Sequence, residues 1–135
     1  HLSHIACFNV TVAERALTVK LKMPIYGCDP DLLYLGTKSF SRKIFKDCNV
    51  DTPPGFEGLN TEEDITNSLA SLKTTFPALK KAVIKLNDGF SGEGNAIFSL
   101  EGAPMNEQLI VWIKESLPER LQIVARDLKF AGFME

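Results

Sequence analysis

The apolar positions of the chain follow two periods, which predicts short strands interleaved with helices. Residues 4–12 are apolar and β-branched enough for a strand, and residues 12–21 place apolar side chains near one face of a helix. Residues 23–27 form a second short apolar run that ends in a turn at residues 27–30. The start of the chain therefore predicts a β-α-β unit.

Two further helices carry local start and stop signals. Thr37 can cap a helix that runs to about Cys48, and Asn49 suits the left-handed position that ends it. Thr61 and Asp64 form a variant of the capping box at the start of the next helix. The side chains expected to face inward from these two helices are Phe40, Ile44, Phe45, Ile65, Leu69, Leu72 and Phe76.

The second half of the chain predicts a hairpin followed by a helix. Strands at about residues 82–87 and 95–100 flank a glycine-rich loop. An apolar stripe from Met105 to Leu117 predicts a core-facing helix, which Pro118 would end. Residues 121–125 predict a strand, and the last ten residues give no assignment. Because helices alternate with strands throughout, the predicted fold class is α/β (α+β).

Composition and charge remove several classes of protein. The chain has 135 residues, of which 44% are hydrophobic and 24% are charged, as in a soluble domain that buries a core. A formal net charge of −2 gives no electrostatic case for nucleic acid as a partner. No apolar stretch approaches the roughly 18 residues that a membrane helix needs, so no membrane partner is expected.

The cysteines and the N-terminus indicate an intracellular origin. Cys7, Cys28 and Cys48 match neither a disulfide framework nor zinc-site spacing, so reduced thiols in a cytoplasmic protein are expected. The N-terminus shows no secretory signal pattern, and its first residue, His1 rather than Met, suggests a piece of a longer protein. Neither His1 nor His4 has acidic or thiol partners at ligand spacing, so no metal role is expected for them.

The segment from residue 82 to residue 98 carries the strongest functional signal. Its first strand ends in Lys85, and Gly89, Gly92 and Gly94 follow before the apolar pattern resumes. A glycine-rich turn between two strands can close its backbone N–H groups over an anion, and a lysine at its root adds positive charge. The pattern is neither a Walker loop, because no Gly-Lys-Ser/Thr follows, nor a kinase loop, because Ile97 occupies the final glycine position. The segment therefore predicts a site for the triphosphate of a nucleotide.

Plainer interpretations of the basic residues remain open. Lys85 in an apolar strand is costly to bury without a partner, which favours a function, but an edge-strand lysine that reaches water would need none. Lys38, Arg42, Lys43 and Lys46 can equally form the solvated face of a helix.

Two sequence blocks, in this order, resemble the ATP-grasp superfamily of carboxylate–amine and carboxylate–thiol ligases. The first block, residues 35–55, has a lysine (Lys38) that opens a helix and an exit of the form gly-val-x-x-pro-x-gly, in which Asn49 replaces the first glycine. The second block is the Lys85 strand with its glycine-rich loop. Within the superfamily, residues 85–95 look closest to peptide ligases of the pheganomycin-synthesis type. The eukaryotic IQ-motif-containing relatives are another group to which the chain could belong.

The resemblance implies a division of the chain and a set of ATP-binding residues. Residues 1–34 would end the domain that precedes the ATP-grasp fold, and residues 35–135 would form its N-terminal lobe. Lys38 would approach the α-phosphate, and Lys85 would reach the α- and β-phosphates. Backbone amides of the loop would cover the β- and γ-phosphates, and the loop residues so implied are Gly89, Ser91, Gly92, Glu93 and Gly94.

The reaction implied is that of an ATP-dependent carboxylate–amine ligase. The γ-phosphate would pass to an unidentified carboxylate, and an unidentified amine would attack the resulting acylphosphate. The Mg²⁺ ligands would lie in a second lobe outside residues 1–135. This stretch alone is therefore not expected to be active, and no catalytic or metal-binding residue is assigned within it.

Two carboxylates depart from what a phosphate loop requires. Asp88 and Glu93 lie in or beside the loop, where they would repel a triphosphate. Their side chains could point away, Mg²⁺ could lie between, or the loop could fail to bind phosphate. Side chains that point away from the phosphates are the favoured alternative. A loop that fails to bind phosphate would support a rival function, a degenerate ATP-grasp-like module with a regulatory or protein-interaction role.

Overall fold

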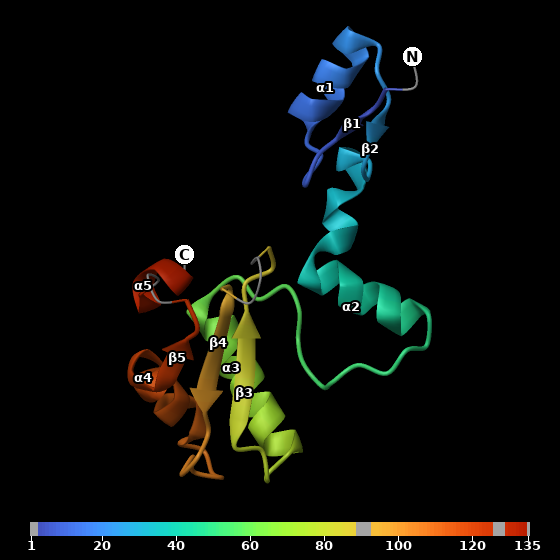
Figure 1. The fold of residues 1–135 in the computed structure, drawn as a ribbon. Helices are drawn as coiled ribbons and strands as arrows, with labels where there is room; N and C mark the ends of the chain where they lie inside the picture. Colours follow the sequence, from blue (N-terminus) through green and yellow to red (C-terminus); the bar gives the residue numbers. More distant parts are fainter. Residues whose placement is uncertain (1–2, 89–92, 126–128, 135) are drawn as a thin grey trace.

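Two groups of elements are joined through a central helix, as Figure 1 shows. The computed structural model describes residues 3–88, 93–125 and 129–134. An N-terminal group holds strands β1 and β2 with helix α1, and a C-terminal group holds a three-stranded sheet with helices α3, α4 and α5. This mixture of helices and small sheets confirms the α/β (α+β) class.

The N-terminal group is the predicted β-α-β unit. Strand β1 (Ile5–Ala6) pairs in parallel with β2 (Ile25–Tyr26), and α1 (Val12–Leu21) forms the crossover. Thr11 and Glu14 form a capping box at the start of α1, and Lys22, with a φ of 52°, ends the helix in the left-handed conformation. Both strands are much shorter than predicted, and the apolar side chains of α1 are largely exposed.

A 3₁₀ helix that the sequence did not predict, η1 (Pro30–Gly36), connects β2 to helix α2 (Lys38–Asp47). Arg15 of α1 donates hydrogen bonds to Asp29 at 3.1 Å and to Asp31 at 2.7 Å, which fixes the start of η1 against α1. The end of η1 lies against α2, where the Tyr34 and Phe40 rings make an edge contact with their centroids 4.8 Å apart.

Helix α2 begins and ends as predicted. The Thr37 hydroxyl accepts a hydrogen bond from the Phe40 amide, and Asn49 adopts a φ of 55° just beyond the helix. The inward position predicted for Phe45 is wrong, because its side chain is 45% exposed. The short η1 helix lies beside Phe40, and none of the core elements covers the side of α2 that carries Phe45.

The C-terminal group is built on an antiparallel sheet in the order β3-β4-β5. The predicted hairpin is present as β3 (Lys81–Lys85) and β4 (Asn95–Ser99), and β5 (Leu121–Ile123) pairs with the far side of β4. Alternate residues of the sheet face inward, and these are Ala82, Ala96, Phe98 and Leu121. They form one core with helices α3 (Glu62–Thr75) and α4 (Leu109–Arg120).

Helix α3 begins with the predicted capping box, in which Thr61 Oγ1 accepts from the Asp64 amide and the Asp64 carboxylate accepts from the Thr61 amide. Leu69 on its inner face is buried, as predicted. Phe76 at its end is largely exposed, so its predicted inward position is wrong. Phe76 is the residue that ends the helix, with a φ of −124°, which turns it away from the stripe.

Helix α4 begins and ends later than predicted. Met105 lies outside it, in a turn where Asn106 Oδ1 accepts a hydrogen bond from the Gln108 amide at 3.0 Å. Pro118 lies within the last turn, where a proline removes a single donor and the Leu121 amide still bonds to the Leu117 carbonyl. The buried side of the predicted stripe is Leu109, Ile113 and Leu117.

The end of the chain forms a short helix that the sequence did not predict, α5 (Phe130–Met134). Its Phe133 is 3% exposed and completes the core next to β5. Among the described residues, the whole buried apolar cluster lies between positions 69 and 133, so the C-terminal group holds the hydrophobic core.

Candidate nucleotide-binding site

The two sequence blocks meet at the start of helix α2. The Lys38 amide donates to the Asn87 carbonyl at 3.2 Å, and the Ser39 amide donates to Asn87 Oδ1 at 3.0 Å. Ser39 and Asn87 are 48 positions apart in the chain. The helix that Lys38 opens therefore lies directly beside the root of the hairpin loop (Figure 1).

Lys85 lies on the outward face of an edge strand. Because β3 is at the edge of the sheet and its residues alternate in burial, Lys81, Val83 and Lys85 all face away from the core, and Lys85 is exposed. Of the two interpretations of Lys85 that the sequence leaves open, the structure shows the edge-strand lysine that reaches water. The cost of burying its charge is therefore no argument for a function, and its location beside the α2 contact is the relevant observation.

The outward face of the sheet carries both polar and apolar side chains. Lys85 lies opposite Asn95 in the register, Val83 lies opposite Ile97, and Ile97 lies opposite Gln122 on β5. Val83 is 55% exposed, so an apolar patch lies in the middle of the face, with Lys85 at the loop end. Asn95 Oδ1 is buried, and no donor reaches it within the described residues. This face offers an apolar surface with a cation at its loop end.

The hairpin loop is described only at its two ends. Gly89, Ser91 and Gly92 lie outside the described residues. Gly94 is buried, and its carbonyl accepts from the Leu86 amide at 2.7 Å, which closes the base of the loop. Glu93 is exposed at the same turn. Of the predicted loop residues, the structure thus places Glu93 and Gly94 next to the base of the Lys85 strand.

The two carboxylates that do not fit a phosphate-binding loop both lie at the surface. Asp88 and Glu93 are exposed, and neither forms an ion pair within the part of the chain that the structure describes. Solvent exposure weakens their repulsion of a nearby anion, because charges that face water are screened.

The other cations of α2 have partners that explain them. Arg42 Nε donates to the Glu57 carboxylate, and its Nη2 donates to the Pro53 carbonyl at 2.9 Å. Lys46 contacts the same Glu57 carboxylate at 3.3 Å. The Arg42 hydrogen bond holds the pKa of Glu57 below its ordinary value, against a smaller effect of burial that raises it. We call this set of Arg42, Lys46 and Glu57 the α2 clasp, because it holds the segment after α2 against the helix.

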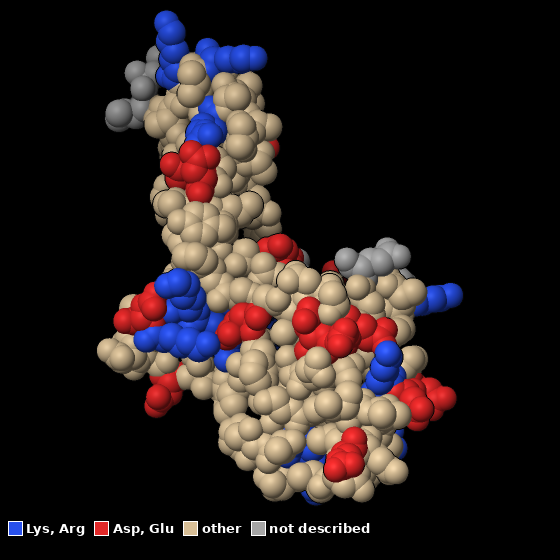
Figure 2. All heavy atoms as spheres, turned by 180° about the vertical axis from the view of Figure 1, so that it is seen from behind, with Lys and Arg blue, Asp and Glu red and all other residues tan. Residues whose placement is uncertain are grey.

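Figure 2 shows the α2 clasp from the side opposite to Figure 1. Blue and red side chains lie together around α2, with no separation into one basic field and one acidic field on this face. Lys43 pairs with Asp47 at 2.7 Å, one helical turn along, and both are exposed. The solvated-face interpretation of Lys43 is therefore confirmed, whereas Arg42 has a structural role that the sequence pattern did not reveal.

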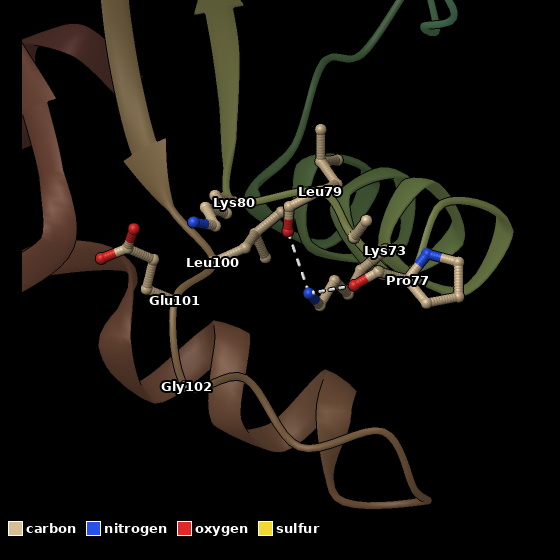
Figure 3. Close-up of a pocket in the computed structure, with 8 residues that line it drawn as sticks. Lys73, Pro77, Leu79, Lys80, Leu100, Glu101 and Gly102 are labelled. Atoms are coloured by element: carbon tan, nitrogen blue, oxygen red, sulfur yellow. Dashed lines mark hydrogen bonds between the residues drawn. The ribbon is translucent and has the colours of Figure 1, made fainter.

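A hollow of about 390 Å³ lies at the other end of the sheet from the hairpin loop. It is lined by Lys73, Pro77, Ala78, Leu79, Lys80, Leu100, Glu101 and Gly102 (Figure 3). Lys73 is 8% exposed, and its ammonium group donates to the Pro77 carbonyl at 2.7 Å and to the Leu79 carbonyl at 2.9 Å. These bonds close the turn between α3 and β3, and no local pattern marked Lys73 in advance.

Two kinds of feature, a metal cluster and a membrane-spanning helix, are absent from the described residues. No group of three or more histidine, cysteine, aspartate or glutamate side chains is arranged to hold a metal ion within residues 3–88, 93–125 and 129–134. In the same residues, none of the helices combines the length and the apolar character needed to cross a bilayer.

The helix opened by Lys38 and the lysine-rooted hairpin, which meet at Asn87, are the two elements that carry the resemblance to ATP-grasp proteins. A model of the family described as "IQCH-like, ATP-grasp" matches residues 31–126, which include both blocks. The chain therefore belongs to the IQCH-like ATP-grasp family.

The similarity of the chain to a curated protein supports the same family. The chain is similar to the IQ motif-containing protein H of Danio rerio, with 30% identity over 99 residues, which is 70% of this chain. The aligned part is 9% of that protein, so the chain spans less than a tenth of its relative's length. No solved structure matches the chain.

Proposed function

We propose that this chain is the ATP-binding lobe of a ligase that activates a carboxylate as an acylphosphate for attack by an amine. The observation that carries the proposal is the contact at Asn87, which brings the Lys38 helix and the Lys85 strand to one place. ATP-grasp enzymes use these two elements on the phosphates, and the family match covers both.

The described residues fit a nucleotide in their charge and location. Lysine is a compact point charge suited to phosphate oxygens, and Lys85 is exposed on a rigid strand, where its ammonium group can reach them. The apolar patch around Val83 gives a surface on which a base can lie. In this proposal the chain binds and orients ATP and supplies no nucleophile or base.

The remaining parts of the site belong to other residues. A bound Mg²⁺ would neutralise the charge that develops on the phosphates, and the described residues offer no ligand cluster for it. As the resemblance to ATP-grasp enzymes implies, we propose that the metal ligands lie in a second lobe. We also propose that residues 1–34 end the preceding domain, that residues 35–135 form the first lobe, and that the protein works in the cytoplasm.

The lysine at the loop end has a matched control on the same strand. Lys81 and Lys85 are both exposed on the outward face of β3, but Lys81 lies at the end away from the loop. In the full-length protein, Lys85→Ala is expected to weaken Mg-ATP binding by about tenfold or more, since it removes a charged hydrogen-bond donor to phosphate. Lys81→Ala is expected to leave the affinity within about twofold. Isothermal titration with Mg-ATP measures both.

The ligase activity needs a separate measurement. ADP release by the full-length protein is assayed with Mg-ATP and panels of carboxylic acids and amines. Release that requires both partners supports the proposal. If the wild-type protein neither binds Mg-ATP nor releases ADP with any panel, the proposal is wrong.

Asp88 and Glu93 favour a second candidate function, a degenerate module with a regulatory or protein-interaction role. Both are exposed beside the loop, where a triphosphate would have to approach two negative charges. Under this alternative, Lys85→Ala changes no nucleotide affinity. The joint substitution Asp88→Asn and Glu93→Gln separates the two functions further, because it should tighten Mg-ATP binding if the loop covers phosphate and leave it unchanged otherwise.

A further inference from the structure

Asn87 has the geometry of a connector between the hairpin and helix α2. Its main-chain carbonyl and its side-chain oxygen accept from two consecutive amides, those of Lys38 and Ser39, at 3.2 and 3.0 Å. Thr37 Oγ1 accepts from the next amide, that of Phe40, at 3.3 Å. The first turn of a helix leaves such donors without partners inside the helix, and here Asn87 supplies two of the acceptors from the turn that follows β3.

We infer that Asn87 is a positioning residue, which sets the location of Lys38 relative to Lys85; the inference rests on the proposed function. Lys85 precedes Asn87 by two residues, and the Lys38 amide is itself one of the two donors. The Leu86 amide, between Lys85 and Asn87, bonds to the Gly94 carbonyl, which fixes this part of the chain to the return strand. The main chains of the two lysines are thus joined by a short, hydrogen-bonded path.

This arrangement reduces the cost of gathering two cations around one anion. Two lysines repel each other until a phosphate lies between them, and their long side chains lose freedom when they bind. A main chain that already holds both lysines in place lowers the ordering cost that ATP binding has to meet.

The chemistry of asparagine suits this position in a second way. Aspartate and asparagine both accept hydrogen bonds at a helix N-terminus. Asparagine does so without adding a negative charge near the proposed phosphates, whereas aspartate would add one. The inference therefore predicts that hydrogen bonding and nucleotide affinity respond differently to the two residues.

The variants are chosen to separate positioning from folding. Asn87→Leu removes the side-chain acceptor at similar size, and Asn87→Asp keeps it. Asn106→Leu is the matched control, since Asn106 Oδ1 accepts from the Gln108 amide at 3.0 Å far from the loop, before α4. Thermal unfolding of each full-length variant checks that the fold is retained.

The first readout is hydrogen–deuterium exchange of the first turn of α2 without nucleotide. Asn87→Leu should speed exchange there, while Asn87→Asp and Asn106→Leu should leave it unchanged. Unchanged exchange in Asn87→Leu overturns the inference, whatever the protein does with ATP.

The second readout is the affinity for Mg-ATP in a double-mutant cycle with Lys38→Ala, which keeps the main-chain donor. Asn87→Leu should weaken binding roughly 3- to 10-fold, the range of one hydrogen bond. In the Lys38→Ala background its effect should shrink below about twofold, because a residue that acts through Lys38 has nothing left to position. Equal effects in both backgrounds overturn the inference. A wild-type protein that binds no Mg-ATP overturns the proposed function instead, and the exchange readout still decides whether Asn87 holds α2.

Discussion

At the scale of single residues, several cations in the described part of the chain have structural partners that account for them. Arg42 and Lys46 are engaged by Glu57, and the ammonium group of Lys73 closes a turn through two carbonyls. Lys85 is exposed on the face that the core leaves open. Its location, rather than its charge alone, distinguishes it as a phosphate-binding candidate.

The α2 clasp predicts a dependence of stability on pH. The Arg42 hydrogen bond lowers the folded-state pKa of Glu57 below its ordinary value of 4.5. The clasp therefore stabilises the fold above that value, and its contribution is lost as the pH falls through the lowered pKa. Glu57→Gln should reduce the free energy of unfolding by roughly 0.5–1 kcal/mol near neutral pH, and the difference from wild type should shrink in acid.

Urea unfolding of both proteins between neutral pH and pH values below 4.5 tests this prediction. Asp47→Asn is the control, because its pair with Lys43 is exposed and should contribute about 0.3 kcal/mol. A difference between Glu57→Gln and wild type that stays constant across this range would contradict the explanation.

At the scale of elements, helix α3 depends on its N-terminal cap. The Thr61 hydroxyl accepts from the Asp64 amide at 3.0 Å, so Thr61→Ala should lower the free energy of unfolding by about 1 kcal/mol. Ser71→Ala is the matched control, since Ser71 is exposed in the middle of the same helix and alanine is the better helix former. Denaturant unfolding measures both, and equal losses would show that the cap is not what stabilises the start of α3.

Local sequence signals predicted the elements well, and the contacts between them poorly. The caps at Thr37 and Thr61 and the left-handed Asn49 depend on neighbouring residues, so the sequence alone predicts them. Phe45 was placed inward wrongly, because helical periodicity shows which side chains share a face but not whether another element covers that face.

The candidate site shows the same limit. The motif blocks identified Lys38 and Lys85, and the family match agrees with the class of protein. The contact at Asn87 joins residues 48 positions apart, and no pattern within a strand or helix encodes such a pairing. The two interpretations of Lys85 stayed open for a similar reason, because the strand order that puts β3 at the edge is a tertiary property.

At the scale of the whole molecule, the core and the candidate site lie on opposite faces of one sheet. The inward face packs against α3 and α4, and the outward face carries Val83, Lys85 and Ile97. Within the described residues, helix α2 is hydrogen-bonded through Asn87 to the turn that follows β3, and Val83 on the outward face is exposed. The chain spans 9% of its curated relative, so the rest of the reaction is proposed for residues outside it.

The claim that Lys38 and Lys85 share one ATP site is tested most directly by lysine labelling. An acylphosphate derivative of ATP transfers its acyl group to lysine amines that lie beside the bound phosphates, and mass spectrometry identifies the labelled residues. If both lysines line one ATP site, Lys38 and Lys85 should be acylated, and excess Mg-ATP should prevent this acylation. Lys81 should be labelled weakly, and Mg-ATP should not change its labelling. Absence of ATP-protected labelling at both Lys38 and Lys85, or equal protection of Lys81, would contradict the claim.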